Sequence, residues 1–287
     1  MYKNFKSNDK KEKLKRIALE TVSIIDKGCY ETSDGKFIDV SNDVTYSVNY
    51  SFIYELKDRI DDVILNKRRP SNLDVRLSKK YTYESLVDYK KEYENCSVFI
   101  LNFASAKNPG GGFLNGSSAQ EESLTRISGL YKSLSSRKEF YEKSKQNPNN
   151  GLYYNLAIYS PNVPFIRDCK NEELFIQPLF ANVITCAAVN RGVASRYNMN
   201  NDLIKLEMVN RIKTIIELFI KQSNPSRKNI LVLGAFGCGV FKNNSSEVAK
   251  SFNYVLDLYK EELSSLDLII DFSIPDDLNY FEFKRWI

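Results

Sequence analysis

The sequence has 287 residues, of which 43% are hydrophobic and 13% aromatic; this is enough for a large buried core and excludes wholesale disorder. Its net charge of +5 comes from 41 basic and 36 acidic residues, and this mixed surface does not indicate a dedicated nucleic-acid-binding protein. Histidine is absent, which excludes Ser-His-Asp triads, Cys-His pairs and histidine-ligated metal sites.

The chain before residue 70 carries helical patterns. Residues 10–27 place apolar side chains at helical spacing with lysines on the opposite face, and residues 51–66 repeat the apolar spacing until the segment 67–70 breaks it. We therefore predict an N-terminal helical extension over residues 1–70. Its lysine-rich face is interpreted as a solvated helix surface, and salt-sensitive binding of nucleic acid is the other interpretation.

From about residue 73 onwards, strand and helix patterns alternate. Strands are predicted at 73–77, 97–103, 156–159, 164–167, 182–186, 230–234 and 268–274. Helices are predicted at about 82–93, 121–136, 203–221 and 245–263. This alternation predicts an α/β sandwich around a mostly parallel or mixed sheet, as one domain over residues 71–287.

Cysteine usage and hydropathy bear on the cellular compartment. The five cysteines are scattered and none has CxxC spacing, so neither a disulfide framework nor a thiolate zinc site is predicted. The N-terminal residues lack the apolar core of a signal peptide, and no apolar run reaches the ~18–20 residues that cross a bilayer. We therefore expect a soluble intracellular protein, cytoplasmic or nuclear, without a membrane partner.

A three-glycine loop at 110–112 follows the predicted strand 97–103. Glycines let the backbone approach a ligand closely, and Glu121 and Glu122 stand as adjacent carboxylates soon afterwards. In a chain without histidine, acid–base chemistry must come from such groups. A structural interpretation competes, because Ser118-Ala-Gln-Glu121 matches the capping box S-x-x-E, in which Glu121 would cap a helix.

A second glycine loop lies between the predicted strand 230–234 and a predicted helix. Gly237 and Gly239 would let consecutive amides face a diphosphate at the strand end. The loop is neither a P-loop, since no GKS or GKT follows, nor a GxGxxG fingerprint. A tight structural turn is the other interpretation. Phe236 is assigned to the core. For Phe241, two interpretations stay open: packing in the core and stacking on a base or ribose.

These residues resemble the signature of the microbial-type poly(ADP-ribose) glycohydrolases, in which three glycines are followed after a short spacer by Gln-Glu-Glu. The glycines at 110–112, a spacer of seven residues and Gln120-Glu121-Glu122 fit this pattern. The resemblance covers most of residues 95–275, through the segments 159–168, 184–190 and 233–241.

The resemblance has limits in three places. Ala187 stands where the family usually has a proline, and Phe236 where a tryptophan is common. The region before about residue 70 resembles the family's helical N-terminal extension only loosely.

The resemblance implies a macrodomain-like three-layer sandwich with a mixed sheet, which binds ADP-ribose in a cleft over the strand ends without a metal or cofactor. It implies that Glu122 is the catalytic acid–base and that Glu121 holds ribose hydroxyls near the scissile bond. The other ADP-ribose-binding residues that it implies are Gln120, Asn102, Asn108, Gly110, Gly111, Gly112, Asn190, Gly237, Cys238, Gly239, Val240 and Phe241.

The implied reaction is hydrolysis of the ribose–ribose bonds of poly(ADP-ribose) to release ADP-ribose, with the polymer or ADP-ribosylated proteins as partners. Such cleavage needs a proton donor to the leaving oxygen, and one carboxyl can then activate the incoming water. Two alternatives stay open: a non-catalytic ADP-ribose reader with the same cleft, and a hydrolase of mono-ADP-ribosylated targets.

Overall fold

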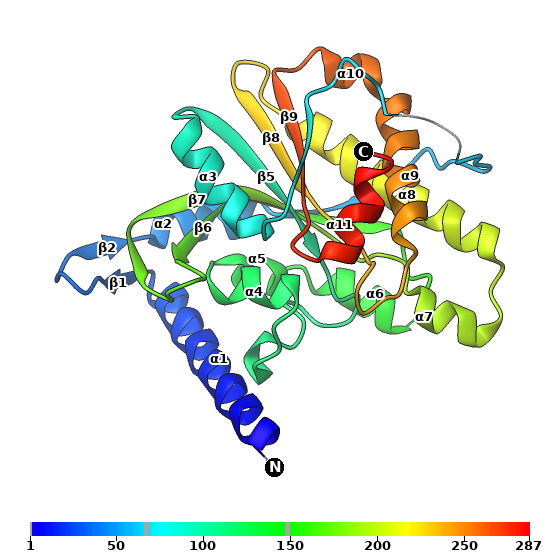
Figure 1. Cartoon of the computed structure of the whole chain (residues 1–287). Coiled ribbons are helices and arrows are strands. Elements are labelled where there is room, and N and C mark those ends of the chain that lie inside the picture. Colours follow the sequence, from blue (N-terminus) through cyan, green and yellow to red (C-terminus); the bar gives the residue numbers. More distant parts are fainter. Residues whose placement is uncertain (1, 66–68, 147–149) are drawn as a thin grey trace.

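The computed structural model describes residues 2–65, 69–146 and 150–287 (Figure 1). Within these ranges, seven strands form one sheet in the order β3-β6-β7-β5-β8-β9-β4. Their bounds are β3 Phe52–Glu55, β4 Val75–Ser78, β5 Cys96–Phe103, β6 Leu156–Arg167, β7 Leu174–Cys186, β8 Lys228–Leu233 and β9 Leu268–Ser273. The pairs β3–β6 and β6–β7 are antiparallel and the other four are parallel, which confirms the predicted mixed sheet.

Helices cover both faces of the sheet. One face packs against α3 (Thr82–Glu92), α4 (Gln120–Arg126), α5 (Leu130–Ser135) and α6 (Lys138–Gln146). The other packs against α7 (Arg191–Ala194), α8 (Asn201–Gln222), α9 (Ser245–Leu258), α10 (Lys260–Ser264) and α11 (Asp277–Lys284). Successive strand side chains point to opposite faces, so Ile100 of β5 joins the first core and Leu101 the second. The predicted sandwich is thus confirmed.

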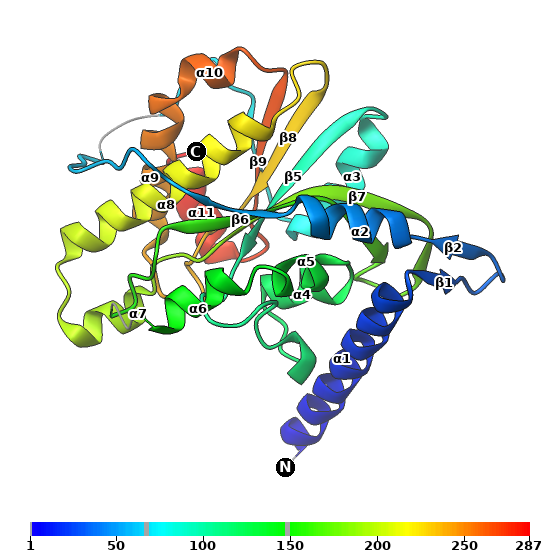
Figure 2. The same ribbon diagram turned by 180° about the vertical axis from the view of Figure 1, so that it is seen from behind.

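The N-terminal helix α1 (Tyr2–Lys27) confirms the helix predicted at 10–27. It packs beside α4 and the 3-10 turn η1 (Phe113–Asn115), and its start extends away from the body of the molecule (Figures 1 and 2). A hairpin of β1 (Cys29–Glu31) and β2 (Phe37–Asp39) and the helix α2 (Ser41–Tyr50) follow; none of these was predicted. In the described ranges, no helix is long and apolar enough to cross a membrane.

The helix predicted at 51–66 is wrong where the structure describes it; residue 66 itself lies outside the described residues. Residues 52–55 form β3, which pairs antiparallel with β6, and residues 56–65 have no regular structure. The Asn210 side chain of α8 bonds both the N–H and the carbonyl of Ile60, at 2.8 and 2.9 Å. Tertiary pairing therefore overrides the helical spacing of the apolar residues.

The bounds of other predicted elements also differ from those in the structure. The helix expected at 121–136 is split into α4 and α5, because Ser128 forms a β-bridge with Phe165 and Gly129 donates to the Pro164 carbonyl at 2.8 Å. The two strands expected at 156–159 and 164–167 are one strand, β6, whose pairing with β7 is irregular between Ser160 and Val163. Similarly, the helix expected at 245–263 divides into α9 and α10.

Candidate active site

The carboxyl ends of the parallel strands β5, β8 and β9 meet at one edge of the sheet, where a cavity of 350 Å³ opens. The loop after β5 leads to α4 on one face, whereas the loop after β8 leads to α9 on the other face. A crevice forms where neighbouring strands send their connections to opposite faces. We call this cavity the cleft. The β5–α4 loop, the β8–α9 loop and the β9–α11 segment supply its walls.

The glycines of the first loop are required by its geometry. Gly110 and Gly111 have φ of +69° and +60°, the left-handed region that L side chains rarely adopt. A Cβ on Gly110 would lie 2.8 Å from Thr125 Cγ2, and one on Gly112 would lie 2.6 Å from Ser117 Oγ. The loop therefore folds tightly over the start of α4 and leaves no space for larger residues.

Glu121 is buried under this loop. Its Oε2 accepts a 2.7 Å hydrogen bond from the Ser105 N–H, and its Oε1 accepts one of 3.3 Å from Asn102 Nδ2. Burial raises its pKa to about 8, because loss of solvation outweighs these two hydrogen bonds. At neutral pH the protonated form of Glu121 is therefore favoured.

The Glu121 carboxylate does not cap the helix, so the capping-box interpretation is wrong. The N-cap of α4 is Ala119, which makes no side-chain capping bond, and Glu121 points instead to the end of β5 and the following loop. The helix begins later than the pattern S-x-x-E requires, with Gln120 as its first residue.

Glu122 takes a different direction from its neighbour. It is half-buried, and its Oε1 accepts a 3.0 Å hydrogen bond from the Gly112 N–H. Its Oε2 has no hydrogen-bond partner in the described part of the chain. One oxygen is thus fixed by the glycine loop, while the other remains able to give or take a proton.

Asn102 holds the Glu121 carboxylate, and Gln120 holds the start of α4. Gln120 lines the cleft, but its amide is held by β5: Oε1 accepts from the Phe103 N–H at 2.9 Å and Nε2 donates to the Leu101 carbonyl at 2.8 Å. The Asn102 side chain is fully buried and also donates to Thr185 Oγ1 at 3.2 Å. These contacts attach the start of α4 to the ends of β5 and β7.

The second glycine loop faces the cleft from the opposite wall. Gly237, Gly239, Val240 and Phe241 line it. Gly239, Val240 and Phe241 present consecutive backbone N–H groups that find no acceptor among the described residues. Such an array of free amides attracts a phosphate. Phe236 is fully buried in the core, as predicted.

Nine of the fourteen predicted site residues are not among those that line the cleft: Glu121, Glu122, Asn102, Asn108, the three glycines 110–112, Asn190 and Cys238. Asn190 caps α7, with Oδ1 accepting from the Val193 N–H at 3.1 Å. Asn108 is exposed on the first loop, and its carbonyl accepts from the Gly111 N–H. Cys238 turns inward, and burial raises the pKa of its thiol to about 12, so it is not a reactive nucleophile.

Sequence reasoning missed two walls of the cleft. One comes from the start of α3, with Thr82 and Tyr83, and the other from the β9–α11 segment, with Pro275 and Asp276. The sequence does contain a signal for the β9–α11 wall, because Ser273-Ile-Pro-Asp276 lies at the end of a predicted strand and offers a helix N-cap residue. Asp276 does cap α11, since its side chain accepts a hydrogen bond from the Asn279 N–H.

Comparisons with known proteins agree with this geometry. Residues 18–168 match the family model described as microbial-type PARG, catalytic domain. The poly(ADP-ribose) glycohydrolase of Thermomonospora curvata, bound to the inhibitor ADP-HPD, is similar with a TM-score of 0.80 and 28% identity, covering 96% of this chain and 100% of that one. The poly(ADP-ribose) glycohydrolase of Deinococcus radiodurans in complex with ADP-ribose is similar with a TM-score of 0.70 and 30% identity, covering 84% of this chain and 96% of that one. A search of curated protein sequences found no match.

Proposed function

The chain belongs to the microbial-type poly(ADP-ribose) glycohydrolase family, and from this premise we propose that Glu122 serves as acid and then base in its reaction. The protein is a glycoside hydrolase with a macrodomain-like fold that hydrolyses the ribose–ribose O-glycosidic bonds of poly(ADP-ribose) and releases ADP-ribose. The family resemblance predicted from the two glycine loops and the Gln-Glu-Glu segment is therefore confirmed.

The role proposed for Glu122 rests on the different contacts of its two carboxylate oxygens. The Gly112 amide holds Oε1, while Oε2 is unpaired among the described residues. In the proposed mechanism, the Oε2 carboxyl gives its proton to the leaving ribose oxygen as the glycosidic C–O bond breaks. The resulting carboxylate then accepts a proton from the water that attacks the anomeric carbon.

The remaining residues bind and orient the substrate in this proposal. The free amides of residues 239–241 receive the diphosphate, whose charge helps stabilise the oxocarbenium-like centre. Glu121, protonated at neutral pH, donates to a ribose hydroxyl beside the scissile bond. Asn102, through Glu121, and Gln120, through the start of α4, act as positioning residues. Asn108 and Asn190 support the two loops from outside the cleft.

The decisive experiment compares wild type with Glu122→Gln on poly(ADP-ribose). We expect the rate to fall by ~10²–10⁴, while ADP-ribose affinity measured by calorimetry is retained. Glu142→Gln, an exposed glutamate of α6, is the matched control and should degrade the polymer like wild type. A Glu122→Gln enzyme of undiminished rate would refute the assigned role.

The alternative functions have separate readouts. A wild-type protein that binds ADP-ribose but does not turn over polymer would be a reader. Faster release from mono-modified than from poly-modified protein would identify a hydrolase of single ADP-ribose units. We propose that the polymer is carried on proteins of the cell interior, because all five cysteines are free thiols, as suits a reducing compartment.

A further inference from the structure

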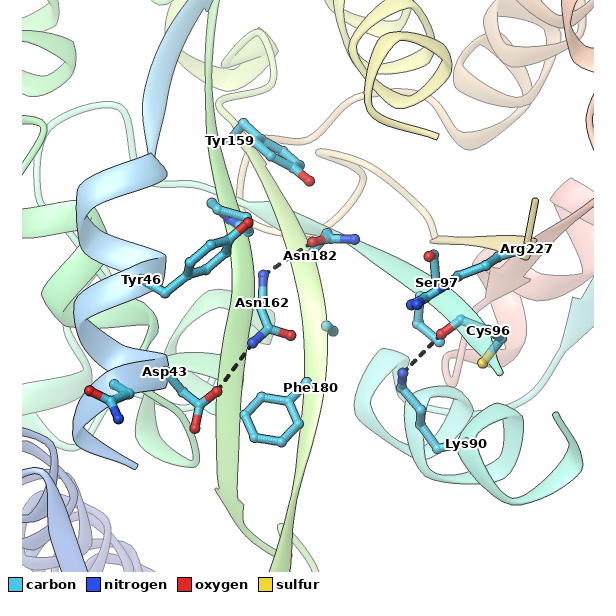
Figure 3. Close-up of a pocket in the computed structure, with 14 residues that line it drawn as sticks. Asp43, Tyr46, Lys90, Cys96, Ser97, Tyr159, Asn162, Phe180, Asn182 and Arg227 are labelled. Carbon is cyan, nitrogen blue, oxygen red and sulfur yellow. Dashed lines mark hydrogen bonds between the residues drawn. The ribbon is translucent and has the colours of Figure 1, made fainter. Parts of the chain in front are cut away.

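A second cavity, of 510 Å³, lies at the start of β5, where Cys96 and Ser97 line it (Figure 3). It forms because β5 and β7 pair only from Phe99 and Asn182 onward, while the earlier part of β7 stays paired with β6. Figure 3 shows the two strands diverging, with residues of α2 on one side and α3 on the other. We call this wedge the β5–β7 groove.

The wall of the groove beside β5 carries two cations. Lys90 of α3 is partly buried, and its Nζ donates to the Cys96 carbonyl at 3.1 Å. Arg227, in the turn before β8, lines the same wall. Neither side chain forms an ion pair with a described carboxylate. Burial, together with the nearby charge of Arg227, lowers the pKa of Lys90. Two neighbouring cations without a counter-ion favour an anionic ligand.

The opposite wall offers aromatic and hydrogen-bonding groups. Tyr46 of α2 is 47% exposed, and the ring of Phe180 lies between the two walls (Figure 3). Asn162 donates from its backbone to Asn182 Oδ1 at 3.1 Å and from its side chain to Asp43 Oδ1 at 3.4 Å. Rings stack on a base, and amide and carboxylate groups read the edge of a base.

We propose that the β5–β7 groove binds a nucleoside phosphate, with the phosphate between Lys90 and Arg227 and the base against Tyr46 and Phe180. The choice of ligand rests on the proposed function, because an enzyme of poly(ADP-ribose) meets adenosine phosphate groups in two forms. One is free ADP-ribose, the product; the other is a unit of the polymer beyond the bond that is cut. Both present the same chemistry to the groove.

The first experiment is calorimetric titration of the full chain with ADP-ribose. Wild type should show two sites, and the double variant Lys90→Gln/Arg227→Gln should lose one, with affinity there falling at least about tenfold. Lys91→Gln, an exposed lysine of the same helix outside the groove, should keep both. Arg227→Gln alone, at an exposed position, gives the same test if the double variant folds poorly. A single site in wild type, or two sites that survive the substitutions, would overturn the proposal.

The second experiment distinguishes the two sources. If a polymer unit occupies the groove, the double variant should lose kcat/KM on long polymer and keep it on a two-unit substrate. If free ADP-ribose is the ligand, both values stay at wild-type level while the second calorimetric site is still lost. Absence of polymer turnover in wild type would refute the proposed function instead, and the calorimetric test of the groove would be unaffected.

Discussion

Gly111 and Glu122 lie so close that a Cβ atom on Gly111 would stand 2.4 Å from Glu122 Oε1. The same atom would be 3.1 Å from Glu121 Oε2, so both carboxylates pack against one glycine. Because Gly112 then donates to Glu122 Oε1 at 3.0 Å, the loop sets the position of the proposed acid–base group. The three-glycine sequence is thus explained by the space that the carboxylates occupy as well as by the ligand.

Gly111→Ala should abolish most of the activity. The new Cβ overlaps Glu122, and a displacement of about 1 Å in a catalytic group costs on the order of 10²-fold in rate. The matched control is Gly35→Ala in the β1–β2 hairpin, where φ is +78° but the nearest atom to a Cβ is 3.7 Å away. Both variants carry similar backbone strain, so equal losses of polymer hydrolysis would contradict this explanation.

Alanine substitutions at the two glycines of the second loop should have different effects, one on stability and the other on ADP-ribose binding. A Cβ on Gly237 would lie 2.6 Å from Ala188 Cβ, so Gly237→Ala should lower the free energy of unfolding by ~1–3 kcal/mol. A Cβ on Gly239 meets no described atom within 4 Å. Gly239→Ala should therefore keep the melting temperature but weaken ADP-ribose binding by about tenfold or more, because it obstructs the free amides. Calorimetry with unchanged affinity would place the diphosphate elsewhere.

The sequence contains most of the information about the carboxylates and the two loops, because these groups are neighbours along the chain. Glu121 and Glu122 are adjacent, and residues 237–241 form one turn between β8 and α9. The contribution of Pro275 and Asp276 to the cleft depends on the spatial order of β8 and β9, which local patterns do not specify. The partner of Glu121 was misjudged for the same reason, since Ser105 lies 16 residues away in the chain.

Sequence patterns did not indicate how two parts of the sheet pair, namely β3 and the start of β5. Residues 52–55 satisfy a helical spacing but become an edge strand through β6. The β5–β7 groove exists because two strands diverge before Phe99, and no residue pattern in either strand predicts where pairing stops.

Arg126 should prove important for holding α1 against the catalytic loop. Its Nε donates to the Leu14 carbonyl at 3.2 Å, its Nη2 donates to the Ser117 carbonyl, and its own carbonyl accepts from Thr21 Oγ1 at 2.7 Å. Arg126→Met leaves two carbonyls without their donor and should reduce stability by ~1–3 kcal/mol. Hydrogen exchange should increase in residues 113–117. Arg285→Met, whose ion pair with Glu282 is at the surface, is the control and should change neither quantity.

Glu121 should make the stability of the protein depend on pH. Its pKa is raised from an ordinary value near 4.5 to about 8 by burial, so the folded protein binds a proton that the unfolded chain releases between these values. The stabilisation from the neutral carboxyl is therefore complete below about pH 4.5 and is lost as the pH rises through about 8. Glu121→Gln carries no titrating proton, and its amide can donate to Asn102 Oδ1, which is buried without a partner among the described residues.

Urea unfolding of wild type and Glu121→Gln at pH 5.5 and pH 8.5 measures this effect. We expect the free energy of unfolding of wild type to fall relative to the variant as the pH rises, by about 1.4 kcal/mol for each pKa unit of the window crossed. Glu142→Gln, which is exposed, should follow wild type at both pH values. A difference between wild type and Glu121→Gln that stays constant with pH would mean that Glu121 is ionised throughout. The proposed ribose hydroxyl would then donate to Glu121 instead of accepting from it.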